Sequence, residues 1–241
     1  MESQFKVLHI ATIKESIVLL LYDKLKELER FGYSICTMSS GDIQQPNFPF
    51  KHYNVDISRR ISPLSDFLSL IKIFRILKKN KFHIVHTHTA KAGFVGRVAA
   101  RLAGVPIVVH TSHGLPFFEG QSPIKNFMYK KLEQVASLFS DGYFSQNNED
   151  LEIIRMMVPK RMLVGYEGNG VHLHKIDQHP RLSEQEKKEL KKSLSIDKNS
   201  FIFLMGARFE DVKNHQMLIN ALTLCKENDT FKVLLAGDGP L

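Results

Sequence analysis

The stretch Phe82–Gly114, FHIVHTHTAKAGFVGRVAARLAGVPIVVHTSHG, predicts a complete strand–helix–strand unit. FHIVHT and PIVVHT are short apolar runs typical of buried strands, and the apolar residues between them recur at helical spacing. Two strands joined by one short helix form a parallel pair with a right-handed crossover. Ligands of parallel sheets bind beyond the carboxyl ends of the strands. His86 and His88 on the first strand, and His110 and His113 on the second, stand near those ends.

The same alternation of apolar strands and amphipathic helices runs along residues 1–166 and predicts about seven strands. We therefore expect an α/β domain with a doubly wound, Rossmann-like parallel sheet. Residues 167–199 are mostly polar and predict a connecting region, with a capping box at Ser183 and Glu186. Residues 200–241 begin a second Rossmann-like pattern that has too few elements for an independent core. The pattern predicts that the chain ends inside its second domain.

Two basic helices are predicted outside the central unit. The first begins near Pro63, and its apolar face consists of Leu64, Phe67, Leu68, Ile71 and Phe74. The second spans 123–140, and its apolar residues in register are Ile124, Phe127, Met128, Leu132 and Val135. Each apolar face is expected to pack on the sheet. The alternative is a basic amphipathic surface that contacts anionic lipid.

The formal net charge of +8 indicates an anionic partner, but the basic residues are scattered and form no Lys/Arg block, which argues against nucleic acid. No apolar run is long enough for a signal peptide or a membrane span. We expect a cytoplasmic protein, at most at the inner face of the plasma membrane, with Cys36 and Cys225 as reduced core residues. The turn at Thr12–Ser16 lacks G-x-G-x-x-G, which argues against NAD or FAD, so no cofactor is expected.

Several segments resemble glycosyltransferase family 4, and in particular bacterial enzymes of capsule and exopolysaccharide assembly. They are RRISPLSDF, VHTHTAKAGFVGRVAARLAGVPIVVHTSHG, GNGVH, GARFEDVKNHQMLINAL and LLAGDGP, in the order seen in that family. The resemblance implies a GT-B fold of two Rossmann-like domains. It implies transfer of a sugar from a nucleoside-diphosphate donor, with retention and without a metal. The implied acceptor is a polyprenyl-diphosphate-linked sugar or a saccharide.

The chain departs from the family pattern in two places. Ile13, Lys14 and Glu15 occupy the first strand–helix turn, where many members carry a glycine pair that helps to seat substrate. The family's paired-glutamate motif, and the residues that hold the donor base and ribose, belong to the second half of the second domain and do not occur in this sequence. We therefore expect the chain as given to be an inactive fragment of an enzyme. The alternative is a non-catalytic remnant that folds only its first domain.

Arg208 and Lys213 are the candidates for binding the donor diphosphate. They follow the apolar strand FIFLMGA and precede a helix whose N-terminal N–H groups and dipole favour an anion. Two fixed cations stabilise the negative charge that grows on the leaving phosphate, so no metal is required. Gly237 and Gly239, in the turn GDGP at the end of the next strand, are predicted to line the donor side.

His113 is the catalytic candidate. It lies in a loop just after a strand, where an imidazole can hydrogen-bond a hydroxyl of the transferred sugar or orient the acceptor, and the family places a histidine here. The alternative is a histidine that caps the following turn. Asn169 and Gly170, in the loop that connects the domains, are further cleft candidates, and Gly170 is expected to adopt a positive φ.

His88, Lys91 and Gly93 are the acceptor-side candidates, placed around a predicted turn at Thr89–Gly93. Lys91 suits an anionic acceptor such as a polyprenyl-diphosphate sugar, or else it covers the helix end. His86 and His88 are two residues apart on a strand and share a face, and such a pair can bind zinc in a metal-dependent hydrolase, a remote alternative function. A catalytic zinc needs a third protein ligand, and no matching carboxylate follows a neighbouring strand, so no metal site is predicted.

Overall fold

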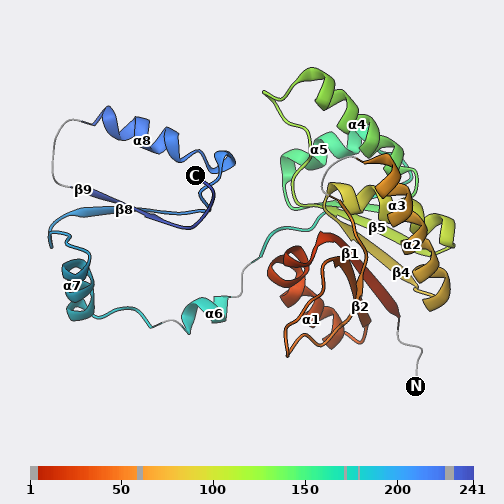
Figure 1. The fold of residues 1–241 in the computed structure, drawn as a ribbon, viewed down its shortest axis with the longest axis horizontal. Coiled ribbons are helices and arrows are strands. Elements are labelled where there is room, and N and C mark those ends of the chain that lie inside the picture. The colour runs from red at the N-terminus through yellow and green to blue at the C-terminus, as the bar shows by residue number, and fades with distance from the viewer. Residues whose placement is uncertain (1–4, 59–61, 171–172, 179, 226–230) are drawn as a thin grey trace. The chain divides into compact units, whose positions relative to one another are not determined.

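The structure is a computed structural model in which residues 5–58, 62–170, 173–178, 180–225 and 231–241 are described (Figure 1). The chain divides into two compact parts, Met1–Gly170 and Val171–Leu241, called unit 1 and unit 2. Each contains its own parallel sheet.

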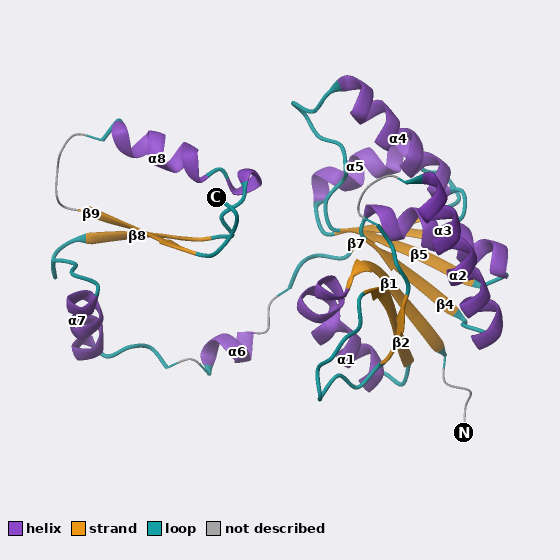
Figure 2. Ribbon diagram, in the orientation of Figure 1, coloured by secondary structure: helices purple, strands orange, loops and turns teal. Residues whose placement is uncertain are grey.

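Unit 1 is built on a seven-stranded sheet in which paired strands run parallel (Figure 2). The strands are β1 (Lys6–Ile13), β2 (Ser34–Ser40), β3 (Lys51–Asn54), β4 (Ile84–His88), β5 (Ile107–Ser112), β6 (Gly142–Ser145) and β7 (Leu163–Tyr166). Their order is β3-β2-β1-β4-β5-β6-β7, so the strand order reverses between β1 and β4. The predicted doubly wound sheet and its parallel β4–β5 pair are confirmed.

Helices cover both faces of this sheet. They are η1 (Ser16–Leu21), a π-helical segment, α1 (Tyr22–Arg30), α2 (Pro63–Asn80), α3 (Ala90–Ala103), α4 (Pro123–Ser137) and α5 (Asn148–Met157). Alternate residues of β1 enter different cores. Leu8 and Ile10 belong to the cluster that includes α2 and α3, and Val7 and Ala11 belong to the cluster that includes η1 and α1. The central strands are therefore buried on both faces, as parallel strands usually are.

The helix α3 begins at Ala90, earlier than the sequence suggests. The backbone N–H of Gly93 already donates to the carbonyl of Thr89 at 2.8 Å, which closes the first helical turn. Thr89 has a φ of 63°, a conformation that is uncommon for a residue with a Cβ. The predicted turn at Thr89–Gly93 is wrong because the chain bends at Thr89 alone.

The predicted packing faces of α2 and α4 are wrong for most of their residues, although Phe74 of α2 does pack against the core and Ile71 and Leu132 are partly buried. The buried residues of α2 are Ser69, Ile73 and Leu77, and those of α4 are Glu133, Ala136 and Ser137. The large apolar residues that these helices expose are Leu64, Phe67, Leu68, Ile124, Phe127, Met128 and Val135. Polar residues face inward because they have partners there. The hydroxyl of Ser69 donates to the carbonyl of Asp56, and the carboxylate of Glu133 pairs with Arg97.

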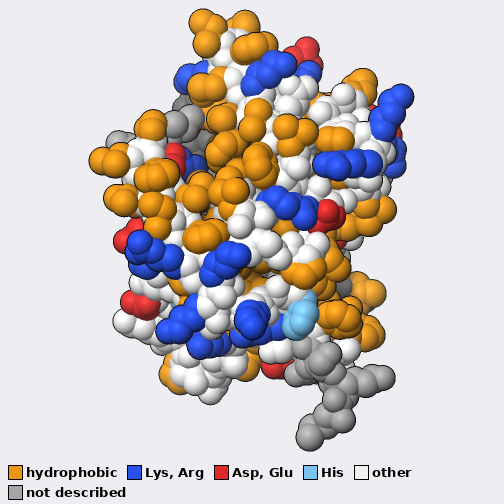
Figure 3. Space-filling view, turned by 90° about the vertical axis from the view of Figure 1, so that its right-hand side faces the viewer, with side chains coloured by type: hydrophobic (Ala, Val, Ile, Leu, Met, Phe, Trp, Pro, Cys, Tyr) orange, Lys and Arg blue, Asp and Glu red, His pale blue; other side chains and the backbone are white. Residues whose placement is uncertain are grey.

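The face of unit 1 that carries α2, α3 and α4 therefore presents hydrophobic side chains to solvent. Figure 3 shows them gathered over this face, with Lys and Arg side chains beside them. On α4, Lys125, Lys130 and Lys131 are exposed, and Nζ of Lys131 lies 5.6 Å from the ring centre of Phe127. No helix within the described part of the chain is long and apolar enough to cross a membrane.

Unit 2 contains a two-stranded parallel sheet. Its elements are α6 (Leu173–Asp177), α7 (Glu184–Ser193), β8 (Phe201–Gly206), the 3-10 helix η2 (Asp211–Lys213), α8 (His215–Thr223) and β9 (Phe231–Ala236). The capping box of α7 is confirmed, because the Ser183 hydroxyl accepts from the N–H of Glu186 and the Glu186 carboxylate accepts from the N–H of Ser183. Cys225 is exposed, so its expected place in a core is wrong, whereas Cys36 is buried.

Candidate functional site

A pocket of about 760 Å³ lies beyond the carboxyl ends of β1 and β4, where parallel sheets bind their ligands. Its polar lining includes Thr12, Ser16, Asp66, Thr89 and Lys91. Its apolar lining includes Phe94, Val95, Tyr129 and Leu132, which α3 and α4 contribute. The pocket therefore joins a polar floor to an apolar wall.

Thr12 and Thr89 join the ends of β1 and β4 at the pocket floor. Their hydroxyl oxygens lie 2.7 Å apart, and the backbone N–H of Thr12 donates to Oγ1 of Thr89 at 3.2 Å. These bonds support Thr89 in its positive-φ conformation. Non-glycine residues in such conformations cluster at functional sites because the surrounding structure must compensate for their cost.

Lys91 is the one acceptor-side candidate that lines the pocket among the three predicted from sequence. Its ammonium forms an ion pair with the carboxylate of Asp66 on α2, and the two side chains are only 15% and 23% exposed. This pair places a fixed cation in the first turn of α3.

Gly93 does not line the pocket, and packing explains why it is a glycine. A Cβ at this position would lie 2.5 Å from Cε1 of His110, closer than real side chains approach. Gly93 thus lets α3 lie close against β5.

His88 and His113 belong to a row of hydrogen-bonded imidazoles that runs from the middle of β1, at His9, to the carboxyl ends of β4 and β5. Nδ1 of His88 lies 3.2 Å from Nε2 of His113, and Nε2 of His88 lies 3.1 Å from Nδ1 of His9. Nδ1 of His113 lies 3.0 Å from Oε1 of Gln146, which directly follows β6. Both ring nitrogens of His113 therefore have partners.

Burial keeps these imidazoles neutral. It lowers the pKa of His9 from 6.5 to about 3, with a smaller contribution from the charge of Lys24. Burial also lowers the pKa of His88 well below 6.5, and the other imidazoles and Lys24 act in the same direction. The pKa of His113 is lowered too, chiefly by burial, although its bond to Gln146 opposes the shift.

His9 provides the third imidazole that the sequence did not place beside His86 and His88. One nitrogen from each of the three lies within 4.8 Å of the others, close enough to hold a metal ion. However, facing nitrogens of His9 and His88 already bond to each other, and the charge of Lys24 acts on all three rings. A nearby cation disfavours a second cation, so the geometry favours hydrogen-bonded imidazoles over a metal centre.

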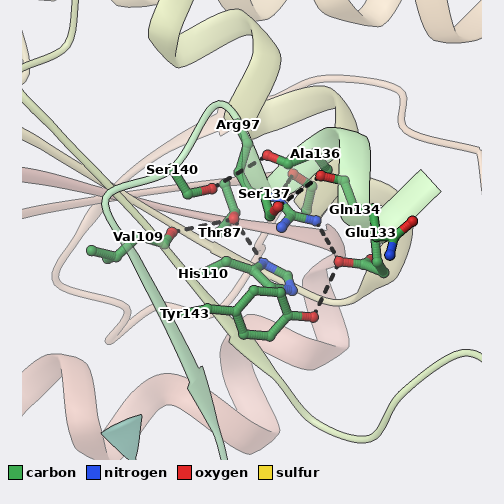
Figure 4. Close-up of polar contacts among 11 residues, drawn as sticks. Thr87, Arg97, Val109, His110, Glu133, Gln134, Ala136, Ser137, Ser140 and Tyr143 are labelled. Carbon is green, nitrogen blue, oxygen red and sulfur yellow. Dashed lines mark hydrogen bonds and ion pairs between the residues drawn. The ribbon is translucent and has the colours of Figure 1, made fainter. Parts of the chain in front are cut away.

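A buried ion pair joins α3 to α4 on the face of the sheet opposite to the imidazole row (Figure 4). The guanidinium of Arg97, on α3, donates to Oε2 of Glu133 on α4 at 2.8 Å, and Arg97 has no exposed surface. The hydroxyl of Tyr143 on β6 donates to the same oxygen at 3.1 Å. Because Glu133 also lines the pocket, this network holds α4 against α3 at the pocket wall.

Unit 2 places the donor-side candidates on one loop between β8 and α8. Arg208 follows β8 and pairs with Oε1 of Glu210 at 2.8 Å, and Lys213 ends η2 just before α8. Both side chains are exposed or partly exposed. The side chain of Asn214 caps α8 by accepting from the N–H of Met217.

Gly237 and Gly239 pack directly against this loop. A Cβ on Gly237 would lie 1.9 Å from the carbonyl oxygen of Ala207, and one on Gly239 would lie 2.2 Å from that of Phe209. The N–H of Phe209 donates to the carbonyl of Asp238 at 3.0 Å. Both glycines are thus needed for the close approach that holds the segment around Arg208.

Asn169 and Gly170 are exposed residues at the end of unit 1. The expected positive φ at Gly170 is wrong, because the residue of this loop with a positive φ is Gly168, at 74°. Nearby, Glu167 pairs with Lys24 of α1 and so attaches the segment after β7 to that helix. The turn therefore comes two residues earlier than predicted.

Comparison with known proteins decides the family. A family model described as "Glycosyl transferase 4-like" matches residues 6–147. The chain belongs to this family. It is 38% identical over 189 residues to the UDP-Gal:alpha-D-GlcNAc-diphosphoundecaprenol alpha-1,3-galactosyltransferase of Escherichia coli, a match covering 77% of this chain and 48% of that enzyme. It is 25% identical over 240 residues to the capsular polysaccharide biosynthesis glycosyltransferase CapM of Staphylococcus aureus, covering 96% of this chain and 61% of CapM.

Solved structures share the fold of this family member. A glycosyltransferase from Rickettsia africae matches with a TM-score of 0.72 at 19% identity, over 98% of this chain and 61% of that one. HepE from Anabaena, solved in complex with UDP, matches with a TM-score of 0.70 at 17% identity, over 98% and 62%. The fold is that of the GT-B glycosyltransferases, as the resemblance implied. The chain spans less than two thirds of the length of each of these four proteins.

Among the residues of this candidate site that sequence reasoning missed, four polar ones have partners that explain their place. Thr12 and Thr89 form the pocket floor, Asp66 fixes Lys91, and Gln146 bonds to His113. Three of them were open to detection, because Thr12, Thr89 and Gln146 lie at or just beyond the carboxyl ends of predicted parallel strands. Asp66 gave no such signal, since its partner is 25 residues away on another helix.

Proposed function

We propose that this protein is a glycosyltransferase of cell-surface polysaccharide biosynthesis. It moves a sugar from a nucleoside-diphosphate sugar to a lipid-linked or saccharide acceptor, with retention at the anomeric carbon. The observation that carries the proposal is the family match over residues 6–147, because this range contains every residue that lines the pocket. The E. coli relative is named for a UDP-galactose donor and a diphosphoundecaprenol-linked acceptor, which suggests the same chemical classes here.

The pocket of unit 1 suits a lipid-linked diphosphate sugar. Lys91 and the hydroxyls of Thr12 and Thr89 offer hydrogen-bond donors to sugar and phosphate oxygens. The apolar wall formed by Phe94 and Leu132 offers a surface for the first units of a polyprenyl chain. In this proposal His113 contacts the transferred sugar from the adjoining strand end.

The loop of unit 2 that carries Arg208 and Lys213 suits the donor diphosphate. The ion pair between Arg208 and Glu210 is largely exposed, and such pairs contribute little, so Arg208 can turn to a phosphate at small cost. Two cations at the beginning of a helix stabilise the leaving diphosphate. We propose that they take the place of a metal ion in the reaction.

The exposed apolar face of α2 and α4 suits an anionic membrane surface, where a polyprenyl-linked acceptor resides. Ile124 and Phe127 project from α4 with exposures of 81% and 64%, and lysines flank them. Apolar side chains that enter the lipid interface, together with lysines that meet anionic headgroups, are the combination that holds a protein on such a surface.

For the 241-residue chain we propose acceptor binding without transfer. The sheet of unit 2 exposes Phe201 and Leu204 of β8 to solvent, at 63% and 68%, so the Arg208 loop rests on a weakly supported sheet. A donor that is bound loosely loses the orientation on which transfer depends.

Calorimetric titration of the chain with a short-chain lipid-diphosphate N-acetylglucosamine tests whether the pocket binds the proposed acceptor. We expect binding that Lys91→Met weakens by about tenfold or more, the scale of one charge-assisted hydrogen bond. Lys187→Met, on α7 of unit 2, is the matched control and should leave acceptor binding unchanged.

Incubation of the chain with labelled UDP-galactose and this acceptor should give no product. Robust product would show that the donor site does not depend on the Arg208 loop as proposed, and absence of acceptor binding would refute the function itself.

A further inference from the structure

With the amide oxygen of Gln146 facing Nδ1 of His113, the row of imidazoles behind His113 has one consistent arrangement of protons. The amide oxygen of Gln146 accepts a hydrogen bond, so Nδ1 of His113 must carry the proton. A neutral imidazole has one N–H, and Nε2 of His113 is therefore an acceptor. Nδ1–H of His88 donates to it, which leaves Nε2 of His88 to accept from Nδ1–H of His9.

This arrangement is protected from exchange with water along most of its length. His9 and His88 have no exposed surface, and His113 is partly buried. Nε2 of His9 ends the row, because it is buried and has no hydrogen-bond partner among the described residues. Within the described part of the chain, the row therefore hydrogen-bonds to a more exposed side chain at Gln146, which is partly exposed beyond β6.

We propose that His88 and His9 are positioning residues that hold His113 as the Nδ1–H tautomer, with its ring fixed at Nε2. The inference rests on the proposed function, in which His113 contacts the transferred sugar. Because Nε2 of His113 is bonded to His88, a substrate can form a hydrogen bond to the ring only at Nδ1–H, where it would replace Gln146. His113 thus acts as a hydrogen-bond donor to a sugar hydroxyl, and its lone pair is not offered to the substrate as a base.

The register of the sheet explains how the row is assembled. His9 on β1 pairs with His86 on β4, and His88 lies two residues further along the same strand and on the same face. His88 in turn pairs with Thr111 on β5, two residues before His113. The hydroxyl of Thr111 bonds to Nε2 of His86 at 2.7 Å, so His86 stacks on His88 without entering the row. Three parallel strands therefore contribute one imidazole each.

Nitrogen-15 NMR of the histidine side chains of the whole chain tests the proposal without substrate, because it distinguishes the two neutral tautomers from the cation. At neutral pH we expect His113, His88 and His9 as Nδ1–H tautomers, the form that an unconstrained imidazole does not favour. His88→Phe removes the donor to Nε2 of His113, so nothing opposes a turn of the Gln146 amide that brings its NH2 group to Nδ1, and His113 should return to a mixture dominated by Nε2–H. His88→Asn keeps an amide donor near the position of Nδ1 and should restore the wild-type signal of His113.

His110→Asn is the matched control, because His110 is equally buried but bonds to Thr87 on the other side of the sheet. It should leave the His113 signal unchanged. A wild-type His113 in the Nε2–H form, or an unaltered His113 in His88→Phe, would overturn the proposal. So would the stoichiometric shift of His9, His86 and His88 signals on adding Zn²⁺, which would identify a metal site. None of these results depends on sugar transfer, so a failure of the proposed function leaves the tautomer measurement valid, and the reverse also holds.

Discussion

The strands β4 and β8 look alike in sequence but differ in the structure. Both are short apolar runs, IVHTH and FIFLMG, that precede a helix. β4 lies in the middle of seven strands, and Val85, Thr87 and His88 have no exposed surface. β8 has one neighbour, and Phe201 and Leu204 are more than half exposed. The comparison teaches that coverage by helices and neighbouring strands, which a strand's own residues do not specify, determines whether the strand is buried.

The largest expected consequence of this difference is in hydrogen exchange. Amides of β4 should open only with global unfolding of unit 1, whereas those of β8 need only local opening of a two-stranded sheet. We expect the β4 amides to exchange at least about a thousandfold more slowly, which corresponds to about 4 kcal/mol. Mass spectrometry of peptides from both strands measures the ratio. Equal protection would show that unit 2 is as stable as unit 1 and would break the comparison.

The buried histidines make unit 1 sensitive to acid. Burial lowers the pKa of His9 from 6.5 to about 3, so between these values the unfolded chain binds a proton that the folded chain does not. The stabilisation is therefore complete above pH 6.5 and is lost as the pH falls toward 3. At about 1.4 kcal/mol per pKa unit it is on the order of 5 kcal/mol for His9. Lys24 adds to the shift of His9, and Glu167, which pairs with Lys24, opposes the effect of that charge.

Intrinsic tyrosine fluorescence reports the unfolding of unit 1 selectively. The chain has no tryptophan, and its six tyrosines are Tyr22, Tyr33, Tyr53, Tyr129, Tyr143 and Tyr166. Urea midpoints should fall steeply between pH 6.5 and 4.5, and His9→Leu should reduce that slope. A slope that is identical in wild type and His9→Leu would mean that His9 is not kept neutral in the folded protein.

The buried ion pair of Arg97 and Glu133 gives the next effect in size. Glu133→Gln leaves the guanidinium of Arg97 buried without a carboxylate, which costs about 3–5 kcal/mol in comparable cases. Arg101→Ala is the matched control, because the side chains of Arg101 and Asp141 are 35% and 46% exposed and ion pairs open to solvent contribute about 0–1 kcal/mol. Urea unfolding followed by tyrosine fluorescence measures both. Similar costs for the two variants would contradict the assignment of a structural role to burial of the pair.

Local patterns in the sequence sufficed for the strand–helix–strand unit, the doubly wound sheet and the capping box at Ser183. Each depends on residues close together in the chain, such as the helical repeat between Gly93 and Gly104. The place of His113 just after β5 followed from the same reasoning. These features are predictable because the hydrophobic period and the turn residues act over one or two elements.

Features that depend on distant partners were not predictable. Glu133 faces the interior because Arg97, 36 residues earlier, is there to pair with it, and that reverses the expected face of α4. His9 and His88 meet across 79 residues through the register of two strands. Whether Cys225 is exposed depends on which other elements pack on unit 2, and the apolar pattern around Cys225 does not specify that. In each case the contact that decides the outcome joins residues too far apart in the chain for a local sequence pattern to indicate it.

The smallest expected effect concerns the membrane and separates the units by surface chemistry. Both units expose apolar side chains. In the surface of unit 1 that we assign to lipid, the exposed Ile124 and Phe127 of α4 lie among the exposed lysines Lys125, Lys130 and Lys131.

The chain should co-sediment with vesicles containing phosphatidylglycerol and should be released by salt, which screens the charges. Reversing two lysines, Lys130→Glu with Lys131→Glu, should weaken binding by about thirtyfold or more, because the two lost positive charges alone contribute about 1 kcal/mol each. The corresponding pair on α7, Lys187→Glu with Lys188→Glu, should have little effect. If both pairs weakened binding equally, attraction would come from net charge alone, and equal binding to neutral vesicles would remove the electrostatic part of the argument altogether.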